Sequence, residues 1–196
     1  MAFRVYPGFR STPHRPGAIF EPNKTPKATM NLARYMSTEM IDLWLPPPEE
    51  PPDNPELNLA KFHQRQKERY LDLFVSLLEN SGKVLHHRKL HADFVNRERK
   101  ASTALERGIA IPHVRSRHVR EVLIGFARSF EGIDFNSLDD NPSHLFFIIA
   151  SPSQLSDTHL KIYKQLMTMF SYSSTYEELM EINNPGEVIR IIRQFD

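Results

Sequence analysis

The chain has 196 residues, a length that suits one domain with an appendage and is sufficient to bury a substantial core. Its formal charge of +1 shows none of the basic excess that proteins gripping nucleic acid backbones usually carry, so nucleic acid is not an expected partner. The absence of cysteine excludes disulfides, thiolate nucleophiles and cysteine-based zinc sites.

The N-terminal residues 1–29 form a proline-rich arm. Proline at this density opposes helices and strand pairing, because it fixes φ and removes the N–H donor. No apolar run approaches the ~20 residues needed to span a bilayer, and the N-terminus has no apolar core of signal-peptide length. We therefore expect no membrane insertion and a cytoplasmic location. The prolines of the arm are Pro7, Pro13, Pro16, Pro22 and Pro26.

The arm also carries four aromatic residues, Phe3, Tyr6, Phe9 and Phe20. One interpretation is a disordered tail. The aromatic residues favour instead an extended arm that lies on its own domain or on a neighbouring subunit. The second arrangement would join two copies of the chain in a homodimer.

The domain proper is expected to cover residues 30–196. It opens with a short helix at 31–36 and a strand at 40–45. A run of prolines and acidic residues follows at 46–55, and such a run favours polyproline II geometry. We interpret 46–55 as a loop insertion, in preference to a ligand for a proline-binding domain.

Two helices are expected next, at 57–80 and 87–99. Apolar residues of the first recur at mostly three- or four-residue steps, which is the spacing of one helix face. Ser81 and Gly82 provide a C-terminal stop, because glycine can take the left-handed conformation. The apolar residues of that face are Leu59, Phe62, Tyr70, Phe74, Leu77 and Leu78.

Three strands are expected at 109–111, 119–127 and 145–150, with a connection rich in Gly, Asp and Asn at 129–142. The run at 145–150 is continuously apolar and bounded by turn residues. This pattern is typical of a strand that is covered on both faces.

Three helices complete the chain. The first spans 155–170, and the second is expected to begin with a capping box formed by Thr175 and Glu178. The third begins at Asn184 and Pro185, an N-cap followed by proline at the first helical position, and runs to Phe195. Helices on both sides of a few strands predict an α/β layered domain.

The candidate for chemistry is His113, which follows Pro112 at the end of the apolar strand 109–111. Neutral imidazole, with a pKa near ~6.5, is an available nucleophile for group transfer. A phosphoryl group arriving there would need cationic and hydroxyl donors, and Arg97, Ser102 and Thr103 are nearby residues of the right type. A core or loop histidine without chemistry remains the alternative.

A metal site is not expected. His87 and His91 have the i, i+4 spacing of two metal ligands on a helix, but two ligands do not close a zinc site. No nucleotide-binding glycine loop, GxSxG or HExxH motif is present. We expect no bound cofactor.

The run S-T-A-L-E-R-G-I-A-I-P-H resembles the signature of the type-2 IIA domains of the bacterial phosphoenolpyruvate-dependent phosphotransferase system, the fructose, mannitol and nitrogen-regulatory class. The resemblance extends from about Met30 to Phe195. Its matching residues are Arg97-Glu98, Ser102-Thr103, Gly108, Ile109-Ala110-Ile111, Pro112-His113, Gly132-Ile133-Asp134-Phe135, Ala150-Ser151-Pro152 and His159-Leu160.

The resemblance implies a small mixed sheet with helices on both faces. It also implies that His113 accepts a phosphoryl group from a histidine-containing phosphocarrier protein and passes it to a IIB component. Arg97 and His159 match the family residues that line the phosphoryl site. The chain departs from the family where Ala104, Glu106 and Val114 replace frequent glycines, a change that puts partner choice in doubt more than phosphorylation.

Two other functions stay open at this point. A nitrogen-regulatory type of domain would act as a binding module whose phosphorylation state controls a target protein. A degenerate interaction domain would keep the fold without the chemistry. In that case Arg97, His113 and His159 should not converge in space.

Overall fold

The computed structural model describes residues 30–53, 56, 58–171 and 174–196. The arm at 1–29 lies outside these residues, so its docking and the homodimer stay predictions. The described elements are η1 (Ala33–Tyr35), η2 (Thr38–Met40), β1 (Ile41–Asp42), α1 (Leu59–Glu79), α2 (His87–Glu98), β2 (Ile109–Ala110), β3 (His113–Arg115), β4 (Leu123–Ile133), β5 (Ser143–Ser151), α3 (Ser156–Met169), α4 (Ser174–Glu181), α5 (Pro185–Ile192) and η3 (Arg193–Phe195).

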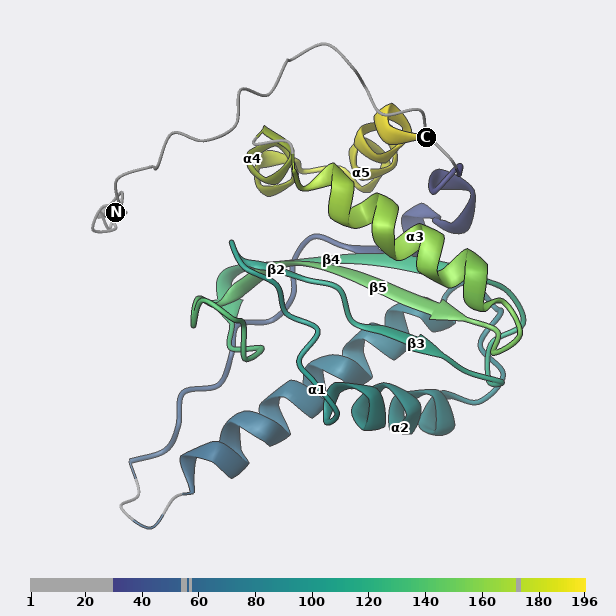
Figure 1. The fold of residues 1–196 in the computed structure, drawn as a ribbon. Coiled ribbons are helices and arrows are strands. Elements are labelled where there is room, and N and C mark those ends of the chain that lie inside the picture. Colours follow the sequence, from purple (N-terminus) through teal and green to yellow (C-terminus); the bar gives the residue numbers. More distant parts are fainter. Residues whose placement is uncertain (1–29, 54–55, 57, 172–173) are drawn as a thin grey trace.

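A mixed five-stranded sheet forms the middle layer (Figure 1). β4 and β5 are antiparallel, whereas β1 runs parallel to β4, and β2 and β3 run parallel to β5. Helices α1 and α2 cover one face, and α3, α4 and α5 cover the other. The expected small mixed sheet with helices on both faces is confirmed.

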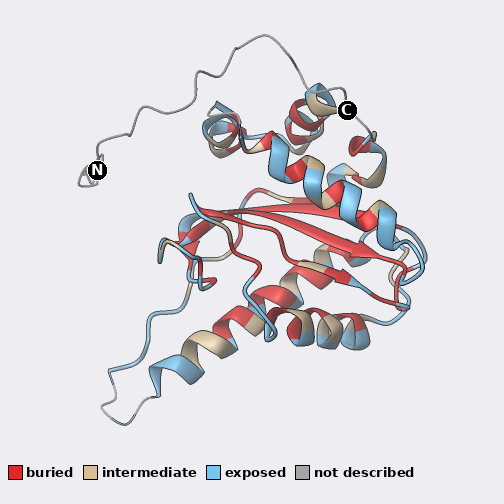
Figure 2. Ribbon diagram, viewed as in Figure 1, coloured by how far each residue is buried: buried red, intermediate tan, exposed pale blue. Residues whose placement is uncertain are grey.

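The central strand β5 explains why both faces are covered. Its side chains alternate between the two layers: Leu145, Phe147 and Ile149 pack with the α3–α5 layer, and the residues between them pack with α1 and α2. All are fully buried, as the red strands of Figure 2 show. The prediction of a doubly covered strand at 145–150 is therefore confirmed.

The strand expected at 119–127 is β4, which begins later, at Leu123, and continues to Ile133 through the expected connection. The register shifts between Arg128 and Ile133, where the strand bulges. Ser129, inside the bulge, accepts a hydrogen bond from the N–H of Gly132. The Gly, Asp and Asn residues that predict a connection from 129 thus belong in part to a bulged strand, where local polar composition does not indicate pairing.

Smaller differences occur at element ends. The strand expected at 40–45 is reduced to the two residues of β1, and the first expected helix is the 3₁₀ turn η1. Helix α4 begins at Ser174, so Thr175 lies inside its first turn and is not the N-cap. The Asn184 cap of α5 is confirmed, because its side chain accepts from the N–H of Gly186.

The proline-rich stretch runs along α1. The hydroxyl of Tyr70 donates to the carbonyl of Pro46 (2.8 Å), and the amide of Gln66 donates to the carbonyl of Glu49 (2.7 Å). Arg69 forms an ion pair with the Glu49 side chain. The first part of the predicted insertion is thus attached to one helix, α1.

Nowhere in the described part of the chain is a helix long and apolar enough to cross a membrane.

Candidate phosphoryl site

A pocket of about 750 Å³ opens at one edge of the sheet. It is bounded by the end of α2, the strand β3 and the start of α3. Basic side chains from all three of these elements contribute to it, together with hydroxyls and two carboxylates. Its lining residues are Asp93, Asn96, Arg97, Lys100, His113, Val114, Arg115, Ser153, Ser156, Asp157, His159 and Leu160.

His113 is the first residue of β3, a short strand that the sequence did not predict. β2 and β3 pair with successive parts of β5 and are separated at Ile111-Pro112, where proline has no N–H to donate. The carbonyl of Pro112 accepts from the N–H of Ile149, which holds the break against β5. His113 therefore lies at the sheet edge, where both helical layers can reach it.

The backbone determines which nitrogen of His113 carries the lone pair. Nδ1 lies 2.8 Å from the carbonyl oxygen of Ile111. A carbonyl can only accept, so Nδ1 must carry the proton when the imidazole is neutral. The lone pair is then on Nε2, which is the nitrogen free to act as a nucleophile.

Arg97, in the last turn of α2, directs its guanidinium at that lone pair. Nη2 and Nε of Arg97 lie 2.9 and 3.2 Å from Nε2 of His113. Nη1 donates to the carbonyl of Ala101 at 2.9 Å, so the guanidinium has a fixed orientation. Donors held about 3 Å from the nucleophile are close enough to bind the oxygens of a phosphoryl group attached there.

Two rings of α3 pack against His113 from the other layer. The ring of His159 has its centroid 5.5 Å from that of His113, and the ring of Tyr163 lies at 5.0 Å. The hydroxyl of Ser151 lies 2.7 Å from Nδ1 of His159. Within the described residues no partner is found for Nε2 of His159, which leaves this nitrogen available to a ligand.

Both imidazoles are neutral at neutral pH. Burial is the main cause that lowers the pKa of His113, and the charge of Arg97 acts in the same direction. Burial first, and then the neighbouring His113 and arginine side chains, lower the pKa of His159 to about 4. A neutral His113 is what nucleophilic attack requires, since protonation would remove the lone pair.

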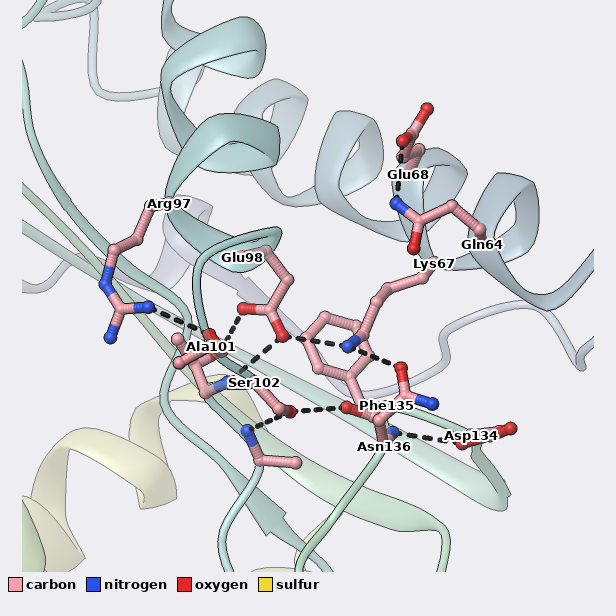
Figure 3. A network of polar contacts seen from close by, with 12 residues as sticks. Gln64, Lys67, Glu68, Arg97, Glu98, Ala101, Ser102, Asp134, Phe135 and Asn136 are labelled. Atoms are coloured by element: carbon pink, nitrogen blue, oxygen red, sulfur yellow. Dashed lines mark hydrogen bonds and ion pairs between the residues drawn. The ribbon is translucent and has the colours of Figure 1, made fainter. Parts of the chain in front are cut away.

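Ser102 and Thr103 have different surroundings. The Ser102 hydroxyl donates to the carbonyl of Phe135 at 2.7 Å and accepts from the N–H of Ala104 (Figure 3). The Thr103 hydroxyl donates to Glu98 at 2.6 Å, and the residue is 5% exposed. Neither residue is among those that line the pocket.

Three residues around the site were given no role from the sequence. Tyr163 lies one helical turn after His159, so an i, i+4 comparison on that helix could have found it. Ser151 and Glu98 carry no local signal of their role, because their contacts depend on the folded chain. Of the histidine pair His87 and His91, His87 has both nitrogens engaged by carboxylates, Nε2 by Asp72 at 2.9 Å and Nδ1 by Glu79 at 3.0 Å.

An imidazole with an unprotonated Nε2, a guanidinium that donates to it and a second neutral imidazole, on a mixed α/β sheet, form the arrangement expected of a phosphoryl carrier. Residues 54–195 match the family model described as "Phosphoenolpyruvate-dependent sugar phosphotransferase system, EIIA 2". The chain belongs to this family. The resemblance stated from the sequence is confirmed.

Individual relatives support the same assignment. The chain is 35% identical over 135 residues to the PTS system fructose-specific EIIABC component of Bacillus subtilis, covering 69% of this chain and 21% of that protein. It thus spans about a fifth of that relative. It is 30% identical over 128 residues to the PTS system fructose-specific EIIA component of Haloferax volcanii, covering 65% of this chain and 83% of that one.

Among solved structures, the nitrogen regulatory protein IIA-Ntr of Neisseria meningitidis superposes with a TM-score of 0.69 at 26% identity. The match covers 82% of this chain and 98% of that one. Relatives named for fructose transport and for nitrogen regulation are therefore both present.

Proposed function

We propose that this protein is a phosphoryl carrier that accepts a phosphoryl group on Nε2 of His113 from a histidine-containing phosphocarrier protein and passes it to a IIB component. The observation that supports this most directly is the 2.9 Å approach of Arg97 to the lone-pair nitrogen of a half-buried, neutral histidine. The carrier role agrees with the family. The identity of the accepting atom and of the two partners is the proposal.

In the proposed transfer, the Nε2 lone pair attacks the phosphorus of the donor's phosphohistidine. The new Nε2–P bond forms as the donor's N–P bond breaks, and the donor imidazole leaves with the electron pair. No proton has to move, because Nδ1–H of His113 stays hydrogen-bonded to Ile111 throughout. In the transfer to the acceptor, a nucleophile of the acceptor attacks the phosphorus, the Nε2–P bond breaks, and the neutral His113 imidazole leaves with the electron pair.

The surrounding side chains have complementary roles. In the resting protein the N–H groups of Arg97 donate to the lone pair of Nε2, and from the same position they can donate to the oxygens of a phosphoryl group attached there. His159 offers Nε2 to the same group, while Ser151 holds its other nitrogen. Because the transition state spreads charge over three oxygens, positioned donors contribute most of the stabilisation. Ser102 and Thr103 would act through the loop between α2 and β2 and not by direct contact.

The regulatory alternative keeps the same chemistry with a different acceptor. It is favoured by the similarity to IIA-Ntr over most of the chain. In this version, the phosphorylated His113 changes the affinity for a target protein. The convergence of Arg97, His113 and His159 speaks against the third option, a degenerate domain without chemistry. The cytoplasmic location remains an expectation from the sequence.

Incubation with the phosphotransferase donor chain and labelled phosphoenolpyruvate tests the proposal. Wild type should take up acid-labile phosphate, and His113→Ala should take up none. Arg97→Lys keeps the charge but loses the paired donors, and should label about ten- to a hundredfold more slowly.

Arg99→Lys is the matched control, because Arg99 is exposed and pairs with Glu68 at 2.7 Å, away from the pocket lining. It should label at the wild-type rate. Equal labelling of wild type and His113→Ala would refute the proposal. To separate the two acceptors, labelled protein is offered a IIB domain: loss of label indicates transport, and retention favours a regulatory target.

A further inference from the structure

Beside Arg97 lies a buried ion pair that the proposed transfer does not use. Glu98 follows Arg97 in the last turn of α2 and is not among the residues that line the pocket. Figure 3 shows its carboxylate directed toward Lys67. Nζ of Lys67, from α1, lies 2.8 Å from Oε1 of Glu98, and the two side chains are 5% and 4% exposed. Burying two charges costs several kcal/mol per ion, so such a pair is weak support for stability by itself.

The carboxylate of Glu98 binds the returning loop. Oε1 accepts from the backbone N–H of Thr103 at 3.0 Å, and Oε2 accepts from its hydroxyl at 2.6 Å. One carboxylate thus satisfies Lys67 and both donors of Thr103. The chain between 98 and 103 is closed into a short loop whose far end is attached to the helix that carries Arg97.

That loop supplies the carbonyl that orients Arg97. Ala101 lies inside it, and its carbonyl accepts from Nη1 of Arg97. Thr103 also accepts from the N–H of Ile111, the residue whose carbonyl holds Nδ1 of His113. The loop therefore contacts Arg97 directly and His113 through Ile111, although Glu98 itself touches neither reacting atom.

Further contacts hold the Lys67 end in place. Nζ of Lys67 also donates to the side chain of Asn136 at 2.9 Å and lies 4.6 Å from the ring centroid of Phe135. The carbonyl of Phe135 accepts from Ser102, inside the same loop. Two helices and two loops are connected at this point, as Figure 3 shows.

From these contacts we infer that Glu98 is a positioning residue: by binding Thr103 it holds the 98–103 loop, and through Ala101 it holds the Arg97 guanidinium against Nε2 of His113. This inference rests on the proposed phosphoryl transfer at His113. Lys67 has the supporting role of neutralising the buried carboxylate. Thr103, expected from its type to bind the phosphoryl group, acts instead as the attachment point.

Two double variants separate the hydrogen bond between residue 98 and Thr103 from the charge of the Lys67–Glu98 pair. Lys67→Met/Glu98→Gln and Lys67→Met/Glu98→Leu both remove the buried charge pair with side chains of similar size. Gln still offers an oxygen to the N–H of Thr103, whereas Leu offers none. We expect the Leu variant to be labelled about ten- to a hundredfold more slowly than the Gln variant, because a displaced guanidinium misplaces the donors.

A second readout does not depend on phosphorylation. The charges of Arg97 and Glu98, both from α2, act on the pKa of His113, and the rings of His159 and Tyr163, both from α3, contact it. Arg97 lowers the pKa of His113 and Glu98 raises it. Loss of the carboxylate charge is common to both doubles, so a higher pKa of His113 in the Leu variant, measured by NMR titration, reports displacement of Arg97.

Equal labelling rates and equal His113 pKa values in the two doubles would overturn the inference. Val188→Ala, at a fully buried position of α5, controls for lost stability and should label like wild type. If the Leu double does not fold, Thr103→Val replaces it. That variant removes one of the two bonds to Glu98 and should raise the pKa of His113 and slow labelling severalfold, and no change in either would count against the inference.

The outcomes also distinguish this inference from the proposed function. If wild type takes up no phosphate, the proposed function fails, and the titration of the two unphosphorylated doubles still decides the role of Glu98. If wild type is labelled and the doubles behave alike, the function stands and the positioning role is wrong.

Discussion

At the scale of single residues, the proposed chemistry at His113 depends on neighbouring groups that set its tautomer and its charge. The Ile111 carbonyl keeps the proton on Nδ1 of His113, and burial lowers the pKa of the ring and so keeps it neutral. Arg97 donates to the lone pair on Nε2. Each effect is a local contact, yet the residues come from α2, β3 and the segment before it. Without the Ile111 contact, neither tautomer of a histidine at this place would be preferred. Without burial, its pKa would not be lowered.

Two histidines should give opposite pH dependence of stability. The pKa of His159 is lowered to about 4 in the folded protein, against about 6.5 when unfolded. Between these values the unfolded chain binds the proton more readily, so acidification removes stability. The pKa of His87 is raised, chiefly by its hydrogen bond to Asp72, so its stabilisation is full below about 6.5 and is lost as pH rises through the folded value.

Urea unfolding between about pH 5 and 7 tests both signs. His159→Gln should weaken the loss of stability on acidification, and His87→Gln should steepen it. The slope difference for one proton is at most about 1.4 kcal/mol per pH unit. If both variants change the slope in the same direction, the stated protonation states are incorrect.

At the scale of elements, short irregular segments, more than the long helices, determine where the residues of the site lie. The proline that separates β2 from β3 brings His113 to the sheet edge, and the bulge in β4 leads into the loop that carries Phe135 and Asn136. Glycine is required at the end of that bulge, where the backbone is left-handed and closely packed. Gly132 has φ +78°, and a Cβ there would lie 2.7 Å from Cε1 of His144.

Gly132→Ala and Gly82→Ala separate backbone strain from crowding. Gly82 has φ +68° but nothing within 4 Å of an added Cβ, so its substitution should cost about 1–2 kcal/mol, the left-handed penalty alone. Gly132→Ala should cost about 1–3 kcal/mol more, because His144 and Pro142 must also move. Chemical denaturation of the two variants measures the difference. Equal losses of unfolding free energy in the two variants would mean that His144 and Pro142 move away from the added Cβ without cost.

At the scale of the whole molecule, Arg128 joins the sheet to the far helical layer. It is fully buried in β4, and its Nη1 donates to carbonyls at the end of α4, while Nε donates to the carbonyl of Leu43 at 3.3 Å. Its guanidinium lies 4.3 Å from the ring centroid of Phe130 and 5.4 Å from that of Trp44. Nη2 has no partner in the described structure.

Arg128→Met should lower the free energy of unfolding by about 2 kcal/mol. Several buried carbonyls lose their donor, and removal of a buried charge with one unpaired nitrogen offsets part of that cost. Arg190→Met, at an exposed position of α5, is the control and should stay within about 0.5 kcal/mol of wild type. Urea midpoints give both values. A neutral or stabilising Arg128→Met would show that charge burial is the larger effect.

The sequence by itself determined most of the layered fold, since the signals involved are local. The apolar run of β5, the single apolar face of α1 and the Asn184 cap of α5 depend on residues close together in the chain. The Pro112-His113 pair with Arg97 also identified the family and the candidate nucleophile, because these residues lie within one short stretch of the chain.

Only the tertiary structure decided the chemistry of individual atoms. The proton position on His113 and the attachment of Thr103 to Glu98 depend on how the backbone turns between residues only two and five positions apart. The contact of His159 with His113 joins segments that are far apart in sequence. Ser102 and Thr103 show the limit most clearly. Their residue type suits a phosphoryl group, but a hydroxyl bonds whichever partner the folded backbone places within about 3 Å of it.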